Sequence, residues 1–251
     1  MPTIVIVDEI SFEALGFNTM IVSANQPYFA PFPGFFYKAH LCDVLIILDS
    51  VQFPRRTTWI SRNRFKNSQG TLWMTVPVWK KGLGLQKIKD VRICYDFRWT
   101  RKHLESLKVA YANAPYFADY LPFVEELFSS TFERLTDFNV KIIRYILSQL
   151  EIRTELVLLS ELGAVEGGDL LPVELCRKMG SLHFAAQHSA RKYLNPDLFR
   201  EAGIRIEYFR APSPVYPQLW GDFIPDLSAF DLIFNCGPKA REILIGNPDD
   251  I

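Results

Sequence analysis

The sequence is poor in cysteine and has no long apolar run. Its four cysteines form no CxxC pair and lie near no histidine at zinc-finger spacing. We therefore expect buried or half-buried free thiols, because a disulfide framework is typical of much shorter secreted chains. No stretch approaches the ~18 apolar residues of a membrane-spanning helix, and the apolar run at 3–7 is too short for a signal peptide. These absences predict a cytoplasmic protein with no membrane span.

Net charge and the common signature motifs are also missing. The chain carries 28 basic and 28 acidic residues, which argues against a general nucleic-acid-binding protein, because such a protein needs a positive field. Neutrality combined with 49% hydrophobic residues excludes a globally disordered chain. No GxSxG, HExxH, P-loop or GxGxxG motif is present. The sequence therefore identifies no metal site, and the cofactor is unknown.

What the sequence does contain is an alternation of short apolar runs with helical patterns. The early runs are rich in Val, Ile and Leu, as in strands buried on both faces of a parallel sheet. We predict strands at 4–7, 20–24, 44–48, 73–78, 91–95, 156–159, 182–186 and 204–209, and helices at 35–41, 172–179, 197–202 and 227–235. The predicted fold class is α/β, with a mostly parallel sheet and flanking helices.

A helical segment occupies about residues 100–150. Thr100 is placed to cap a first helix that ends before Pro115, and Ser130 with Glu133 has capping-box spacing before a helix at 131–150. We interpret the aromatic stripe of this segment as core packing; it comprises Phe123, Phe128, Phe132 and Phe138. We predict one α/β domain over residues 1–251, with 100–150 as a candidate helical insertion.

The first candidate ligand-binding loop spans 25–36. Three prolines and Gly34 make a stiff turn that opens a helix, and Gln26 and Tyr28 lie within it. Loops at the carboxyl ends of parallel strands bind ligands, and helix amino ends favour anions. The alternative is a rigid turn whose aromatic rings fill the core.

The second candidate loop, 49–66, is dense in arginine. It contains Asp49, Gln52 and five cations, which are Arg55, Arg56, Arg62, Arg64 and Lys66. Arginine forks bind phosphate or carboxylate in a bidentate way, and Asp49 with Gln52 suits a hydroxyl, an amine or a metal ion. Because both loops follow buried strands, we expect them at the same edge of the sheet. The alternative is a solvated basic loop.

Acid–base and helix-capping candidates lie further along the chain. Among the four histidines, His103 is the best candidate for proton transfer, because it lies in the first turn of a predicted helix beside Lys102. Ser228 and Asp231 have capping-box spacing, so their simplest role is to start a helix. Asp231 and Asn235 are four residues apart and therefore share one helical face.

Several of these segments together resemble the WbqC-like family. The motifs are QPYFAPFPGFF at 26–36, LDSVQF at 48–53 and WISRN at 59–63, followed by Trp99, Lys102, His103, Tyr216, Gln218, Ser228, Asp231 and Asn235. The resemblance covers nearly the whole chain and adds further ligand-binding candidates, namely Asn63, Tyr216, Gln218, Asp231 and Asn235. It implies a role in O-antigen or other bacterial surface-polysaccharide biosynthesis.

The sequence also departs from the family pattern. Ser50 stands where the pattern has a second aspartate, which weakens the case for paired-carboxylate or metal chemistry. Residues 184–188 read FAAQH, without the glycine of the family's YLSGP-like segment. The first loop is also similar to the HxGH turn of nucleotidyltransferases, but Phe32 and Phe35 occupy the histidine positions. The fold is therefore the closer analogy, and the imidazole chemistry is missing.

Our leading hypothesis is a transferase of surface-polysaccharide biosynthesis that acts on a small anionic substrate, a nucleotide-linked sugar or amino sugar. The ligand-binding candidates of the two loops are Gln26, Tyr28, Gly34, Gln52, Arg55 and Arg62, with the arginines as a diphosphate clamp. Asp49 or His103 is the proton acceptor. The alternatives are a non-catalytic module that binds a glycan precursor or a partner enzyme, and a tRNA-dependent aminoacyl transferase. A homodimer is also compatible with the sequence.

Overall fold

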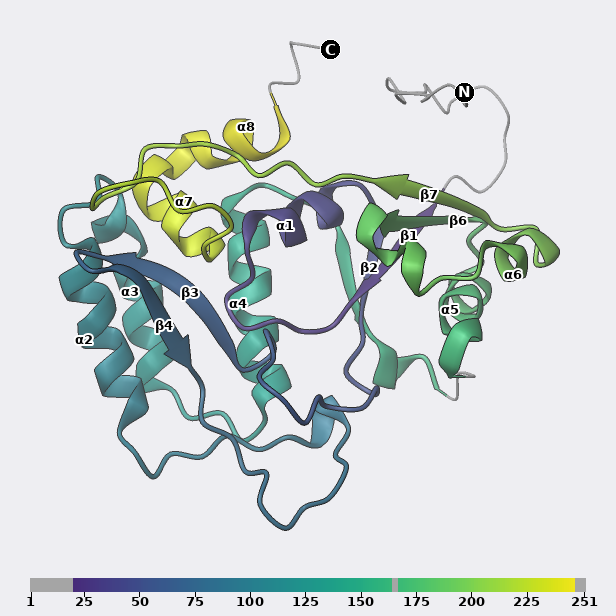
Figure 1. The fold of residues 1–251 in the computed structure, drawn as a ribbon, viewed down its shortest axis with the longest axis horizontal. Coiled ribbons are helices and arrows are strands. Elements are labelled where there is room, and N and C mark those ends of the chain that lie inside the picture. Colours follow the sequence, from purple (N-terminus) through teal and green to yellow (C-terminus); the bar gives the residue numbers. More distant parts are fainter. Residues whose placement is uncertain (1–19, 164–166, 247–251) are drawn as a thin grey trace.

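The main sheet has five parallel strands. The computed structural model describes residues 20–163 and 167–246. The strands are β1 (Ile21–Asn25), β2 (Val44–Ile47), β5 (Glu155–Leu158), β6 (His183–Gln187) and β7 (Arg205–Phe209). Their order is β5-β2-β1-β6-β7 (Figure 1). The predicted α/β class and five of the predicted strands are confirmed, and the strand predicted at 4–7 lies outside the described residues.

Helices cover both faces of this sheet. They are α1 (Pro33–His40), α4 (Leu135–Gln149), α5 (Leu171–Met179), α6 (Pro196–Glu201), α7 (Ala229–Cys236) and α8 (Ala240–Ile245). Because side chains alternate along a strand, Val44 and Ile46 pack in one hydrophobic cluster with α5 and α6. Leu45 and Ile47 pack in the other cluster with α1, α4 and α7. No helix in the described ranges is long and apolar enough to cross a membrane.

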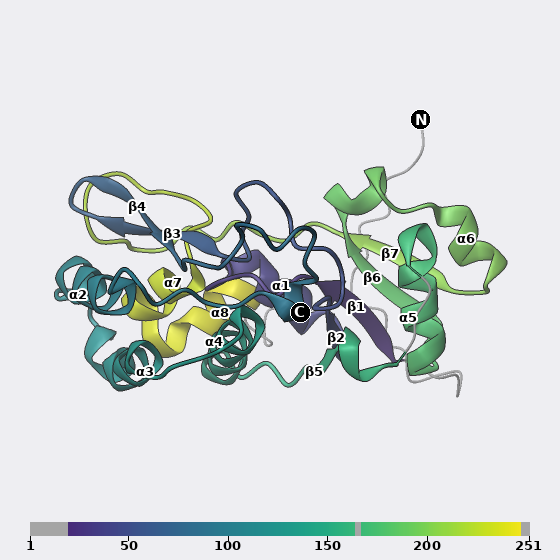
Figure 2. The ribbon, with the colours of Figure 1, turned by 90° about the horizontal axis from the view of Figure 1, so that it is seen from below.

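A two-stranded hairpin lies outside the main sheet. β3 (Arg62–Asn67) pairs antiparallel with β4 (Gly70–Thr75), so the strand predicted at 73–78 is displaced and belongs to the hairpin. Residues 91–95 make only isolated bridges, because they pair with single residues of neighbouring loops. The prediction misses β3, since its charged residues read as a basic loop. In Figure 2 the hairpin and α2 (Trp99–Tyr111) lie at the end opposite α5 and α6.

The helical segment predicted at 100–150 contains α2, α3 (Phe117–Ser129) and α4. The predicted capping box is wrong, because Ser130 ends α3 and its Oγ donates to the Glu126 carbonyl at 2.7 Å. The backbone of residues 133–135 pairs instead with residues 91–93, which delays the start of α4 to Leu135.

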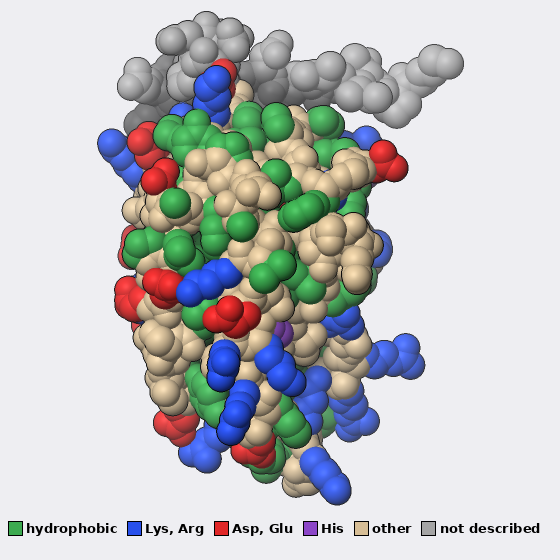
Figure 3. All heavy atoms as spheres, turned by 90° about the vertical axis from the view of Figure 1, so that its left-hand side faces the viewer, with side chains coloured by type: hydrophobic (Ala, Val, Ile, Leu, Met, Phe, Trp, Pro, Cys, Tyr) green, Lys and Arg blue, Asp and Glu red, His purple; other side chains and the backbone are tan. Residues whose placement is uncertain are grey.

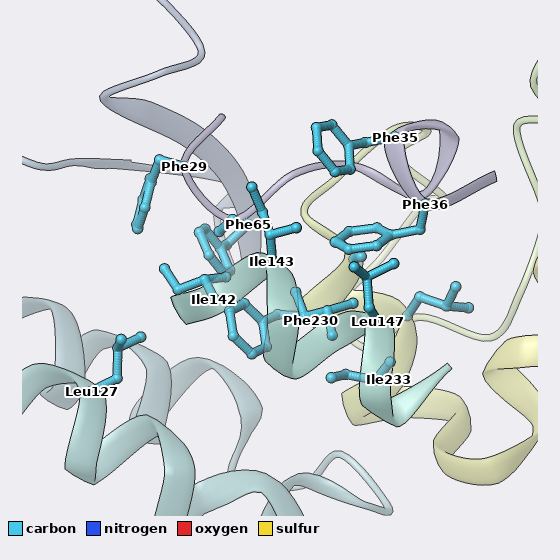
Figure 4. Close-up of a cluster of buried hydrophobic side chains, with 14 of the residues drawn as sticks. Phe29, Phe35, Phe36, Phe65, Leu127, Ile142, Ile143, Leu147, Phe230 and Ile233 are labelled. Carbon is cyan, nitrogen blue, oxygen red and sulfur yellow. The ribbon is translucent and has the colours of Figure 1, made fainter. Parts of the chain in front are cut away.

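Aromatic rings fill the core around α4, as predicted. The rings of Phe128 and Phe138 meet edge to face at 6.1 Å. Figure 4 shows Ile143 and Leu147 of α4 facing the phenylalanines of α1 and of the first candidate loop (25–36), which we call the proline-rich loop. The four cysteines are buried and free, which confirms the expectation for the thiols.

Candidate functional site

The middle of the sheet contains a topological switch point. From β1 the sheet grows on one side through β2 and β5, and on the other side through β6 and β7. β1 pairs with β2 at four positions but with β6 at only two, near the amino ends of both strands. β1 and β6 therefore lose their backbone pairing toward their carboxyl ends. Doubly wound sheets bind ligands at this place.

The proline-rich loop leads from this switch point into α1. A Cβ added at Gly34 would lie 2.9 Å from the Phe32 ring and 3.1 Å from Ala211 Cβ, so only glycine permits this close approach. Lys38 of α1 donates from Nζ to Asn25 Oδ1 at 2.8 Å. Burial lowers the pKa of Lys38 to about 8. The sequence analysis missed Lys38. The feature that could have revealed it is its position on the buried side of a short, aromatic-rich helix.

The two candidate loops are joined by hydrogen bonds. The Phe29 amide donates to the Trp59 carbonyl at 2.8 Å. Asn63 Nδ2 donates to the carbonyl of Phe29 at 3.1 Å and of the next residue at 2.6 Å. Asn139 of α4 donates to the Pro27 carbonyl at 2.8 Å. The structure thus brings the loops together, and the buried Asn63 amide acts as their clamp.

Asp49 follows β2 and binds the segment after β5. Its oxygens accept from the Ser160 amide at 2.9 Å and from Ser160 Oγ at 2.6 Å. Asp49 is 2% exposed, so its carboxylate is desolvated and held by these donors. A cavity of about 570 Å³ lies at this edge, with Ser50, Lys87 and Lys89 in its wall. Asp49 joins the ends of two strands, and the lysines give the cavity positive charge.

The outward face of the hairpin interleaves arginine with tryptophan. The Arg62 guanidinium lies 3.8 Å from the Trp73 ring centroid, and Trp73 stacks on Trp59 at 5.8 Å. Arg64 donates to the Asp226 carbonyl at 3.0 Å. Arg62 Nε has no hydrogen-bond partner among the described residues. Stacking therefore orients the Arg62 fork, which is suited to an anion.

His103 lies on α2, and its ring packs edge to face against the buried rings of Trp99 and Phe128. Its Nε2 is 2.9 Å from the Thr75 carbonyl. Because a carbonyl only accepts hydrogen bonds, Nε2 carries the hydrogen and Nδ1 bears the lone pair of the neutral ring. Burial lowers the pKa of His103, and the hydrogen bond to Thr75 opposes this effect. Thr75 is the register partner of Arg62, so His103 and Arg62 belong to the same end of the hairpin, whereas Asp49 binds the β5 side.

A buried polar network connects α7, α2 and β3. The Asp231 carboxylate accepts from Tyr111 Oη at 2.7 Å and from Tyr216 Oη at 2.9 Å. The Lys66 ammonium donates to Gln218 Oε1 at 3.1 Å. Burial raises the pKa of Asp231, while the two tyrosines and the charge of Lys66 oppose the shift. These polar atoms satisfy one another inside the protein.

The start of α7 explains why Asp231 is not a helix cap. Ser228 Oγ accepts from the Phe230 amide at 3.3 Å, which confirms the predicted N-cap. The second half of the capping box does not form, because the Asp231 carboxylate binds the two tyrosines instead. Asn235 Nδ2 donates to the Asp231 carbonyl at 2.7 Å.

The remaining predicted ligand-binding side chains lie nearer to solvent. Gln52 and Arg55 are exposed, and Gln26 and Tyr28 are half-buried. Burial raises the pKa of Tyr28, and a hydrogen bond with Asn25 lowers it. Within the part of the chain that the structure describes, no three His, Cys, Asp or Glu side chains gather as metal ligands.

Comparison with known proteins places these features in a family. The WbqC-like protein family model matches residues 26–243, which include the second loop, all but the first residue of the first loop, the hairpin and α7. The uncharacterized protein Rv1507c of Mycobacterium tuberculosis is 32% identical over 225 residues, which cover 89% of this chain and 96% of that protein. No solved structure matches the chain significantly. The chain belongs to the WbqC-like protein family.

Proposed function

We propose that the chain is a transferase of bacterial surface-polysaccharide biosynthesis that acts on a nucleotide-linked sugar or amino sugar. The observation that carries this proposal is the switch point, where β1 and β6 pair at only two positions and the proline-rich loop enters α1. Sheets of this topology bind nucleotides at the switch point, and the amino end of α1 favours an anionic group.

The hairpin supplies the proposed phosphate clamp. Arg62 is oriented by Trp73, and its buried Nε has no hydrogen-bond partner in the described ranges. Arg55, which is exposed in the loop that leads into β3, supplies a second cation. Trp59 links this clamp to the proline-rich loop through the Phe29 amide. A diphosphate bound by two arginine forks gains charge-assisted, bidentate hydrogen bonds.

His103 is the better of the two proposed proton acceptors. Burial lowers its pKa, so the ring is neutral at pH 7, and Nδ1 carries its lone pair. Asp49 instead accepts two hydrogen bonds from Ser160. Asp49 is also only 2% exposed, so a substrate hydroxyl or amine has little access to its carboxylate. His103 therefore suits removal of a proton from an attacking hydroxyl or amine.

The test is calorimetric titration of the chain with a panel of nucleotide sugars, followed by a turnover assay with the best binder. Losing a charge-assisted hydrogen bond costs about 1.5–3 kcal/mol, so Arg62→Ala should weaken binding about tenfold or more. The matched control is Arg144→Ala, which removes an exposed arginine of α4. His103→Gln should keep the affinity and lower turnover about 100-fold. No binding by any nucleotide sugar, with Arg62→Ala equal to wild type, refutes the proposal.

A non-catalytic module that binds a glycan precursor or a partner enzyme is the second candidate. It is favoured by the burial of the Asp49 carboxylate, which is held by Ser160, and by Ser50 at the position of the second family aspartate. For a binding module, Arg62→Ala still weakens affinity, but the bound precursor is recovered unchanged. His103→Gln then alters neither affinity nor product.

A further inference from the structure

The loop between β4 and the 3₁₀ helix Ile88–Asp90 projects at the lower edge of Figure 1. Its base is fixed by three hydrogen bonds. The Trp79 amide donates to the Arg92 carbonyl at 3.0 Å, and the Phe53 amide donates to the Gln86 carbonyl at 2.9 Å. Gln86 Nε2 closes the loop by donating to the Trp79 carbonyl at 3.0 Å. Residues 80–85, which we name the tip, are therefore carried on a rigid base.

The tip presents aliphatic side chains to solvent. Its sequence is KKGLGL. Leu83 is 52% exposed and Leu85 58% exposed. Gly82 and Gly84 have φ of +79° and +62°, and a Cβ added at either would meet no atom within 4 Å. The glycines thus face open space, and more than half of each leucine is in contact with water.

The tip belongs to the basic region of a neutral chain. Residues 55–108 contain 14 of the 28 basic residues but only 3 of the 28 acidic ones. Figure 3 shows Lys and Arg side chains gathered in the lower half of the face that carries α2. Arg98, Arg101 and Lys102, at the start of α2, are exposed. Phe97, beside them in the sequence, is 65% exposed. An exposed apolar tip therefore stands within a predominantly basic region.

We propose that the tip docks the chain onto an anionic lipid surface. Leu83 and Leu85 enter the boundary between headgroups and acyl chains, while Lys80 and Lys81 meet lipid phosphates. Trp79, 47% exposed at the base, is suited to the headgroup level, where indoles gather. Single-stranded nucleic acid is a poorer fit to the tip, because bases stack on aromatic rings rather than on leucine. This proposal does not rest on the proposed transferase function.

The experiment is co-sedimentation of the full chain with vesicles. Vesicles of phosphatidylglycerol and phosphatidylethanolamine should bind the chain, and vesicles of phosphatidylcholine should not. The double variant Leu83→Asp/Leu85→Asp should lower the partition coefficient at least tenfold. Lys80→Glu/Lys81→Glu should do the same at low salt, with a smaller loss at high salt. The control is Val215→Asp, because Val215 is 78% exposed and lies outside the tip.

Four results overturn the proposal. They are absence of binding to anionic vesicles, equal binding to neutral vesicles, unchanged binding by the leucine double variant, and an equal loss with Val215→Asp. Light scattering and a titration with single-stranded RNA distinguish other occupants. If the leucine variant dissociates a dimer or loses RNA affinity by the same factor, the tip is a protein or RNA contact. Melting curves matching wild type confirm folding, and nucleotide-sugar titration reports separately on the transferase proposal.

Discussion

Replacing Lys38 by methionine tests the energetics of a buried ammonium at the carboxyl end of β1. Lys38 is 8% exposed, and its Nζ donates to Asn25 Oδ1 at 2.8 Å and to the Ala24 carbonyl at 3.3 Å. Burial lowers its pKa from 10.5 to about 8. No carboxylate accepts from Nζ in the described part of the chain, so burial of the charge is compensated only by neutral acceptors.

The direction of the pH dependence follows from the lowered pKa of Lys38. Below pH 8 both the folded and the unfolded state carry the ammonium, and the full penalty of burying it is present. Between pH 8 and 10.5 the unfolded state binds more protons, so the free energy of unfolding rises with pH. A pKa lowered from 10.5 to about 8 corresponds to about 3 kcal/mol in total. About 2.5 kcal/mol of this is recovered between pH 7 and pH 10.

Urea denaturation of wild type and Lys38→Met over this pH range measures the effect. The difference between their free energies of unfolding cancels the titration of most other groups and should rise by about 2.5 kcal/mol from pH 7 to pH 10. Loss of the hydrogen bond to Asn25 changes this free-energy difference by a constant amount and leaves its dependence on pH unchanged. Burial raises the pKa of Cys42 to about 12, so its thiol titrates above the range. Lys178→Met, at an exposed site of α5, is the control. A flat difference for Lys38→Met refutes the reasoning.

Three further substitutions test the core and the site. Tyr111→Phe removes a donor to the buried Asp231 carboxylate and should lower the free energy of unfolding by about 1.5–3 kcal/mol in urea denaturation. An unchanged free energy would show that this hydrogen bond does not stabilise the fold. Burial lowers the pKa of His103, so its NMR titration midpoint should lie below 6.5. Because the unfolded state then takes up the proton first, His103→Phe should lose less stability than wild type on acidification. A midpoint at or above 6.5 would show that the ring is solvated. Gly34→Ala crowds Ala211 and should cost about 1–3 kcal/mol in thermal melts, whereas no cost would mean that the ring of Phe32 moves freely.

Much of the fold is predictable because the burial of a strand is reflected in the composition of that strand alone. All four residues of β2 are buried, so its VLII run has the composition of a central parallel strand. The hairpin is harder, because β3 carries Arg62 and Arg64 on the outward face and gains its stability from partners elsewhere in the chain. The capping box predicted at Ser130 is wrong for a similar reason, because a hydroxyl near a helix boundary can end one helix or begin the next.

The candidate site is predictable only where its chemistry is contiguous in sequence. Proline, glycine and arginine mark the two loops, and hydrogen bonds bring these loops together. The contact between Tyr111 and Asp231 joins residues 120 positions apart, and no local pattern encodes it. Lys38 is missed because a lysine on a helix is ordinarily solvated, and only the packing of α1 against the sheet buries it.

The motif residues divide into two groups with different expected consequences. The polar side-chain atoms of Asn63 and Asp231 are bound within the protein, so their substitution first lowers stability. Arg62 keeps its cationic group near the surface, so its substitution changes ligand affinity while the fold persists. A family motif marks both groups alike, because a clamp that orients a loop is as necessary as the side chain that the loop presents. Loss of function in Asn63→Ala is therefore evidence about the loop, whereas loss of affinity in Arg62→Ala is evidence about the ligand.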